Sequence, residues 1–183
     1  MCWGSIEGNF QKNLTDIRIA IAGDLHGSWS QDDLDLLLEL NPDGVLFVGD
    51  LSDGDLRIVR GINKISIPTS VVLGNHDRGR DGSGNVLQAQ LDLLGEKNCS
   101  WNLSKWALNE LSVVGARPCS GGGGFLLTPE VKSVFGEVSL DESVFRIVSA
   151  AKSAPLDFPL LILAHSGPVG LGSEASSLCG RDW

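Results

Sequence analysis

Three short apolar runs, each followed directly by a glycine, dominate the first half of the chain. They occupy residues 17–22, 45–48 and 69–73, and isoleucine and valine are frequent in them. A run of this length and composition is typical of a strand whose two faces are both covered, as in a parallel sheet. The pattern therefore predicts three buried strands, each ending at its glycine.

Amphipathic segments separate these runs and predict helices. Ser30-Gln-Asp-Asp33 resembles a capping box, and the leucines that follow it predict a helix through Leu40. Further helices are expected from about Asp55 to Asn63 and from Val86 to Leu94. Strands and helices that alternate at this spacing predict an α/β fold with a parallel sheet. Right-handed crossovers would put helices on both faces of that sheet.

The second half of the chain shows a weaker pattern. Residues 101–108 and 111–116 predict two strands, which could form a hairpin. Ser139-Leu-Asp-Glu142 resembles a second capping box and predicts a helix to about Lys152. Residues 159–163 predict one more buried strand, which ends just before His165. We expect one domain: an N-terminal extension over residues 1–16, a core over residues 17–165 and an irregular tail over residues 166–183.

Composition and charge narrow the function classes. Hydrophobic residues make up 42% of the chain and charged residues 20%, which is ordinary for a globular protein. No apolar run approaches the roughly 18 residues of a membrane span, and the polar start lacks the apolar core of a secretory signal. We therefore expect a cytoplasmic protein without a membrane, and a plastid location would need a longer N-terminus. The net charge of −9 argues against non-specific nucleic-acid binding.

The four cysteines lie far apart and form no CxxC pair. In an intracellular chain this spacing predicts free thiols, neither disulfides nor a zinc ribbon. The residues concerned are Cys2, Cys99, Cys119 and Cys179.

Polar side chains that can bind metals follow four of the predicted strands. They are Asp24 and His26, then Asp50 and Asp53, then Asn75 and His76, and finally His165. Ligands in an open α/β sheet bind beyond the carboxyl ends of the strands, so we expect all of these side chains at that edge. The three histidines of the chain all belong to this set. Aspartate, histidine and asparagine together suit manganese, iron or zinc better than calcium.

Each group taken alone has a simpler interpretation. Asp53 or Ser52 could cap the following helix, and Asn75 could serve a turn that needs a left-handed backbone. A single histidine after a strand, such as His165, is usually structural. The four groups in this order at matching strand ends favour a metal centre. Two ions about 4 Å apart could clamp the attacking and leaving oxygens of a phosphoryl transfer and lower the pKa of a bound water.

The order D-x-H, G-D-x-x-D, G-N-H-D and a later histidine resembles the calcineurin-like metallophosphoesterases. The resemblance runs from Asp24 to His165, and it is greatest to the small branch found in cyanobacteria and plants. It implies a layered α/β sandwich that binds two divalent ions and hydrolyses a phosphate ester with a metal-bound hydroxide. It also implies that His76 protonates the leaving alkoxide or stabilises charge on the phosphate, oriented by Asp53. The implied metal ligands are Asp24 and His26 for the first ion, Asp50 for both ions, and Asn75 and His165 for the second.

Two departures from the family pattern affect the interpretation. The family continues with G-H-x-H, which gives each metal one ligand, but no histidine follows His165 here. We therefore expect a sandwich truncated at its C-terminus, with exposed apolar sheet surface and metal sites that each need a substitute ligand. Gly54 and Asp77 stand where the protein Ser/Thr phosphatases have arginine and glutamate, so the sequence is unlike that group.

Two other functions are compatible with parts of the pattern. A catalytically impaired or non-catalytic binding module of the same fold would explain the missing last motif. A nucleotide-binding α/β domain is disfavoured, because the turn over residues 23–28 lacks both G-x-G-x-x-G and G-x-x-x-x-G-K-[ST].

Overall fold

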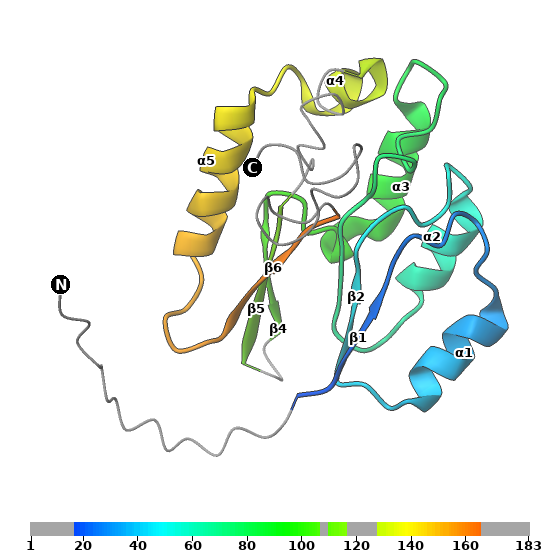
Figure 1. Cartoon of the computed structure of the whole chain (residues 1–183), viewed down its shortest axis with the longest axis vertical. Coiled ribbons are helices and arrows are strands. Elements are labelled where there is room, and N and C mark those ends of the chain that lie inside the picture. Colours follow the sequence, from blue (N-terminus) through cyan, green and yellow to red (C-terminus); the bar gives the residue numbers. More distant parts are fainter. Residues whose placement is uncertain (1–16, 107–109, 117–127, 166–183) are drawn as a thin grey trace, which may run out of the picture.

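The structure is a computed structural model that describes residues 17–106, 110–116 and 128–165. The expected extension, the expected tail, Cys2, Cys119 and Cys179 lie outside these ranges. In the described residues two three-stranded sheets lie at the centre, and helices lie on either side of them (Figure 1).

The first sheet is parallel, as the apolar runs predict, and has the order β1-β2-β3. Its strands are β1 (Ile19–Ala22), β2 (Gly44–Phe47) and β3 (Thr69–Val71), connected by helices α1 (Gln31–Glu39) and α2 (Leu56–Asn63). The predicted capping box is present at Ser30, whose Oγ accepts a hydrogen bond from the Asp33 amide at 3.3 Å. The Asp33 side chain accepts in return from the Ser30 amide at 2.8 Å. Asp55 caps α2 in a similar way.

The second sheet contains the later strands, in the order β4-β5-β6. The strands β4 (Leu103–Trp106) and β5 (Leu111–Gly115) are antiparallel, and β6 (Leu160–Leu163) lies parallel to β5. The remaining helical elements are α3 (Asn85–Leu94), the 3₁₀ turn η1 (Gly95–Lys97), α4 (Pro129–Phe135) and α5 (Leu140–Lys152). The sequence pattern did not predict α4, which is only seven residues long.

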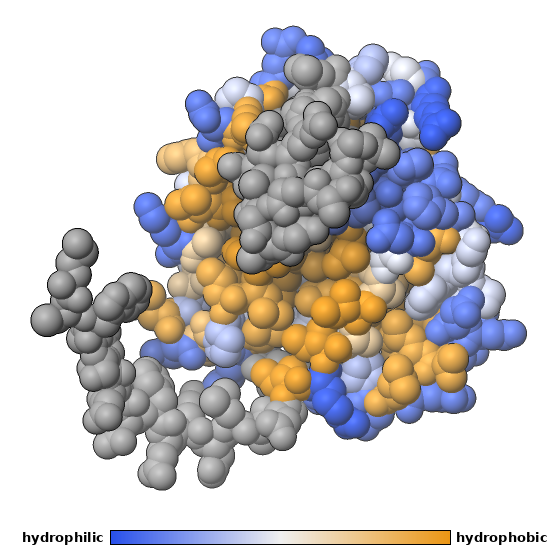
Figure 2. Space-filling view, in the orientation of Figure 1, coloured by the Kyte–Doolittle hydropathy of each residue, from blue (hydrophilic) through white to orange (hydrophobic). Residues whose placement is uncertain are grey.

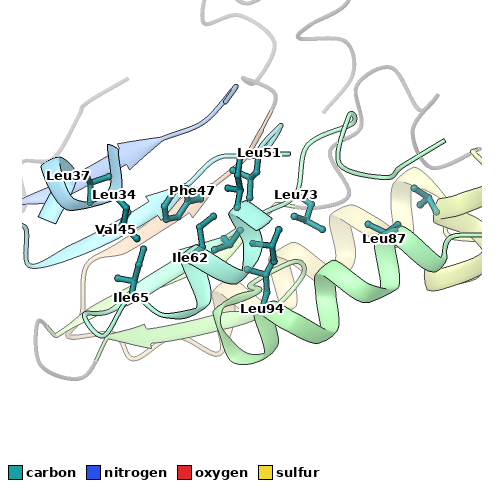
Figure 3. Close-up of a cluster of buried hydrophobic side chains, with 14 of the residues drawn as sticks. Leu34, Leu37, Val45, Phe47, Leu51, Ile62, Ile65, Leu73, Leu87 and Leu94 are labelled. Atoms are coloured by element: carbon teal, nitrogen blue, oxygen red, sulfur yellow. The ribbon is translucent and has the colours of Figure 1, made fainter. Parts of the chain in front are cut away.

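The two faces of the first sheet are covered differently, which corrects the expectation of helices on both. Val45 and Phe47 pack with side chains of α1, α2 and α3 on one face, and Figure 3 shows these side chains gathered between sheet and helices. On the other face Leu46 packs against Trp106 and Val113 of the second sheet. Because a sheet fills that second face, the helices α1 to α3 have only one face to cover. The layered α/β sandwich is thus confirmed.

Apolar side chains are exposed along the strands β1 and β6. Ile21 is 65% exposed, and Leu160 and Ile162 are 39% and 51% exposed. Figure 2 shows a broad apolar surface over the strands on this face of the molecule. Within the described ranges, every helix is too short or too polar to cross a membrane.

The thiol of Cys99 is buried between the sheets, where burial raises its pKa to about 12. A raised pKa lowers the thiolate fraction, and only the thiolate attacks alkylating reagents. We expect Cys99 to resist iodoacetamide at pH 8 in the folded protein and to react fully in denaturant. Peptide mapping by mass spectrometry, with the denatured protein as control, checks this. Rapid native labelling of Cys99 would contradict the burial.

Candidate metal centre

Four strand ends from the two sheets meet at one place. The loop after β1 runs along the loop after β2, since the amide of Asp24 donates to Gly49 O at 2.9 Å and that of His26 to Asp50 O at 3.0 Å. His165 follows β6, so it belongs to the second sheet, which corrects the expectation of one common sheet edge. Its Nδ1 nevertheless lies 2.9 Å from the carbonyl oxygen of Val48. Packing of the second sheet on the first therefore brings His165 next to the polar residues that follow β1, β2 and β3.

Several residues at this meeting point have a left-handed backbone. Asp24, His26, Asp50 and Asp53 all have φ between 46° and 52°. Non-glycine residues seldom adopt this conformation, and when they do they are concentrated at functional sites. The chain therefore turns sharply after β1 and β2 and directs polar side chains into the cluster.

Glycines let the loops approach closely. A Cβ at Gly74 would lie 1.9 Å from Asp50 Oδ1, and a Cβ at Gly49 would lie 2.6 Å from the amide nitrogen of Gly74. Neither position has room for a side chain. Gly49 and Gly74, which end two of the apolar runs, are thus packing requirements of the cluster.

Asp50 lies at the centre of the cluster and is only 4% exposed. Its Oδ1 accepts a hydrogen bond from the amide of His76 at 2.9 Å. Its Oδ2 lies 3.3 Å from His165 Nε2 and 3.9 Å from His26 Nε2. Burial acts to raise the pKa of Asp50, but the hydrogen bonds from His165 and from the His76 amide outweigh it and leave the pKa below its ordinary value. The carboxylate is therefore held in its ionised form.

Two groups of possible ligand atoms flank Asp50. On one side, Asp24, His26 and Asp50 each offer an atom within 4.8 Å of the others. On the other side, Asn75 Oδ1 lies 3.1 Å from His165 Nε2. Nδ1 must be protonated to donate to the Val48 carbonyl. Nε2 therefore donates to Asp50 only when the ring also carries a second proton, and a neutral ring offers the lone pair of Nε2 to a cation instead. The Asp50 carboxylate, Asn75 Oδ1 and His165 Nε2 lie close together, and either a second proton on His165 or a metal cation can balance their repulsion.

Asp53 lies between two histidines at the solvent side of the cluster. Its Oδ1 is 3.0 Å from His26 Nδ1 and 3.4 Å from His76 Nδ1, and the two rings meet edge to face. The hydrogen bond to Asp53 is the main reason why the pKa of His26 is raised. Side chains of His76 and Asp53 are 38% and 47% exposed, so a substrate can reach them. Asp53 thus contacts His26 as well as His76, the residue that it was expected to orient.

A buried polar network of Asp77, Ser52 and Gln90 supports the cluster, and the sequence analysis predicted none of its contacts. Asp77 is fully buried, and its Oδ1 accepts from the amides of Leu51 and Ser52 at 2.8 and 2.9 Å. Its Oδ2 accepts from the Gly74 amide at 2.7 Å. Gln90 of α3 donates to the backbone oxygen of Asp77 and accepts from Ser52 Oγ. Gln90 lies between Leu87 and Leu94 on the apolar stripe of its helix. A polar residue at such a position could have indicated a buried hydrogen-bonded side chain.

Comparison with known proteins gives a single finding. A family model described as calcineurin-like phosphoesterase matches residues 17–177, which include every residue of the cluster. Neither the curated proteins nor the solved structures include a match to this chain. The resemblance inferred from the strand-end residues is confirmed at the level of the family.

Proposed function

We propose that this chain, which belongs to the calcineurin-like phosphoesterase family, hydrolyses phosphate esters with two divalent metal ions bound at the meeting point of its strands. Membership of the family implies metal-dependent phosphoester hydrolysis. The number of ions and the role of each residue are our proposal. The observation that carries it is the place of Asp50, whose Oδ2 faces His26 on one side and His165 on the other.

The donor set fits two ions that share Asp50. Asp24 and His26 would hold the first ion, and Asn75 and His165 the second. Asp50 is ionised, buried and within reach of both groups, which is the arrangement a bridging carboxylate needs. Mixed carboxylate, imidazole and amide donors favour manganese, iron or zinc. The Val48 carbonyl fixes the ring of His165 as a ligand orientation requires.

The chemistry divides between the ions and the side chains at the solvent side. When bound, the two ions would polarise the phosphoryl group and lower the pKa of a coordinated water. His76 would deliver a proton to the leaving alkoxide, since it is exposed and its backbone amide is fixed on Asp50. Asp53 would hold His76 Nδ1, which leaves Nε2 available to the leaving oxygen.

Replacement of His76 tests the proposal. We expect wild-type protein loaded with Mn²⁺ to hydrolyse an alkyl phosphate, whose leaving alkoxide needs a proton, and His76→Ala to lower kcat about 10²- to 10⁴-fold, the usual size of general acid catalysis. Bound manganese should stay unchanged, because His76 is not a proposed ligand. The assay measures released inorganic phosphate, with a chelated sample and the exposed, distant Lys64→Ala as controls.

Two outcomes would contradict the proposal in different ways. Full turnover in His76→Ala would remove His76 from the mechanism while leaving the metal centre in place. A folded, manganese-loaded wild type without turnover would favour a non-catalytic binding module of the same fold.

A further inference from the structure

Arg78 is a cationic side chain that the proposed mechanism does not use. It lies two residues after His76, in the same loop, and its side chain is 29% exposed. Nη1 donates to the backbone oxygen of Asn75 at 3.1 Å, whereas Nε is buried without a hydrogen-bond partner. A guanidinium offers five N–H donors, and an unmet buried donor costs free energy. The buried Nε is out of reach of a substrate, but the partly exposed terminal nitrogens have N–H donors beyond the one that bonds to Asn75.

The surroundings of Arg78 fix its position. Glu130 of α4 is 7% exposed, and its Oε1 accepts from the Gly82 amide at 3.1 Å. Its Oε2 lies 3.8 Å from Arg78 Nε, which is close enough for charge attraction but too long for a hydrogen bond. Glu130 and the Asn75 carbonyl thus hold the guanidinium beside the loop that carries two residues of the metal centre. The arginine is a fixed group, unlike a freely moving surface side chain.

The loop after β2 places a glycine, Gly54, next to the loop that carries Arg78. Gly54, directly after Asp53, has a φ of 95°, and a Cβ there would lie 3.2 Å from Val86 Cγ1 and 3.6 Å from the Cα of Gly79. A larger residue at position 54 would therefore be strained in its backbone and would lie tight against Val86 of α3. Gly54 therefore presents no side chain to the loop of Arg78 and Gly79, and Arg78 is a cationic residue of that loop.

A substrate phosphate is negatively charged, so a cationic side chain beside the metal centre would attract it. Among the arginines and lysines in the described ranges, Arg78 is the one whose side chain donates a hydrogen bond to a residue of the proposed ligand set, Asn75.

We propose that Arg78 forms an anion subsite at the edge of the metal centre and binds phosphoryl oxygens of the substrate. This inference rests on the proposed function, because it assigns a residue to the same substrate. The planar guanidinium can pair with two phosphate oxygens at once through parallel N–H donors. The bond to Asn75 and the attraction to Glu130 leave the outer N–H groups for that contact.

Binding of inorganic phosphate tests the subsite without relying on turnover. Isothermal titration of phosphate into Mn²⁺-loaded protein should show Arg78→Ala with a Kd raised about 10- to 100-fold, the usual effect of lost charge-assisted hydrogen bonds. Arg78→Gln keeps a donor for the Asn75 carbonyl but loses the charge, so its Kd for phosphate should rise by a similar factor. Arg80→Ala removes an exposed arginine from the same loop and should leave the Kd unchanged. Manganese affinity should be the same in all variants.

The outcomes separate this inference from the proposed function. Equal phosphate affinity in wild type, Arg78→Ala and Arg78→Gln would overturn the subsite, as would a manganese-loaded wild type that binds no phosphate. Phosphate binding that depends on Arg78 in a protein without turnover would support the subsite and count against the esterase. If Arg78→Gln turns over with the same KM and the same inhibition by phosphate as wild type, that result would support the esterase and count against the subsite.

Discussion

Asp50→Asn should abolish metal-dependent hydrolysis. The loss of activity should be well above the 10- to 100-fold that follows removal of a residue that only hydrogen-bonds to a metal ligand. Asparagine has the shape of aspartate but no charge, and Asp50 Oδ2 is the atom that faces both His165 and His26. One substitution should therefore weaken both metal positions together. A loss confined to one ion would mean that the two sites do not share this residue.

The measurement is the number of manganese ions bound per chain, together with the rate of aryl phosphate hydrolysis. Asp35→Asn is the matched control, because Asp35 is an exposed aspartate on α1, away from the cluster. A folded Asp50→Asn protein that still binds two ions and turns over normally would refute the bridging role.

Asp77→Ala is expected to have the largest effect on stability. The substitution leaves the buried amides of Leu51, Ser52 and Gly74 without the carboxylate that accepts from them. Each unmet buried group costs about 1–3 kcal/mol, so the three amides together are expected to cost roughly 3–9 kcal/mol. That is a large part of the 5–15 kcal/mol typical of a domain. The loops after β2 and β3 should also separate, which would weaken metal binding.

Urea unfolding followed by circular dichroism measures the change. Asp77→Asn is the graded comparison, because its remaining oxygen can still accept from the Leu51 and Ser52 amides while its NH₂ faces the Gly74 amide. We expect it to lie between wild type and Asp77→Ala in unfolding midpoint. Equal midpoints for wild type and Asp77→Ala would show that these three hydrogen bonds contribute nothing net.

The candidate ligands were predictable because their signals are local. An apolar run that ends in glycine and a polar residue, as at Gly49 and Asp50, marks both the end of a strand and the place where a ligand can lie. The same pattern gave Asp24, His26 and Asn75. The structure adds that Gly49 and Gly74 are needed for close contact between the loops, since a Cβ at either position would meet neighbouring atoms.

Residues whose roles depend on distant contacts were not predictable in this way. Gln90 could be noticed on an apolar helix stripe, but its partner Asp77 lies 13 residues earlier, in the loop after β3. Arg78 is one of two arginines close together, and only its contacts with Asn75 and Glu130 distinguish it from Arg80. The helix α4, which supplies Glu130, is too short to show a clear period.

The sequence by itself determined the strands, most of the helices and the order of metal-binding residues, because periodicity and strand-end chemistry are properties of neighbours in the chain. It did not determine which sheet the last strand joins. Only the tertiary structure placed β6 beside β5, packed the second sheet on the first and so brought His165 to Val48, 117 residues away. That outcome depends on how Leu46, Trp106 and Val113 fill the space between the sheets, and no local pattern specifies such packing.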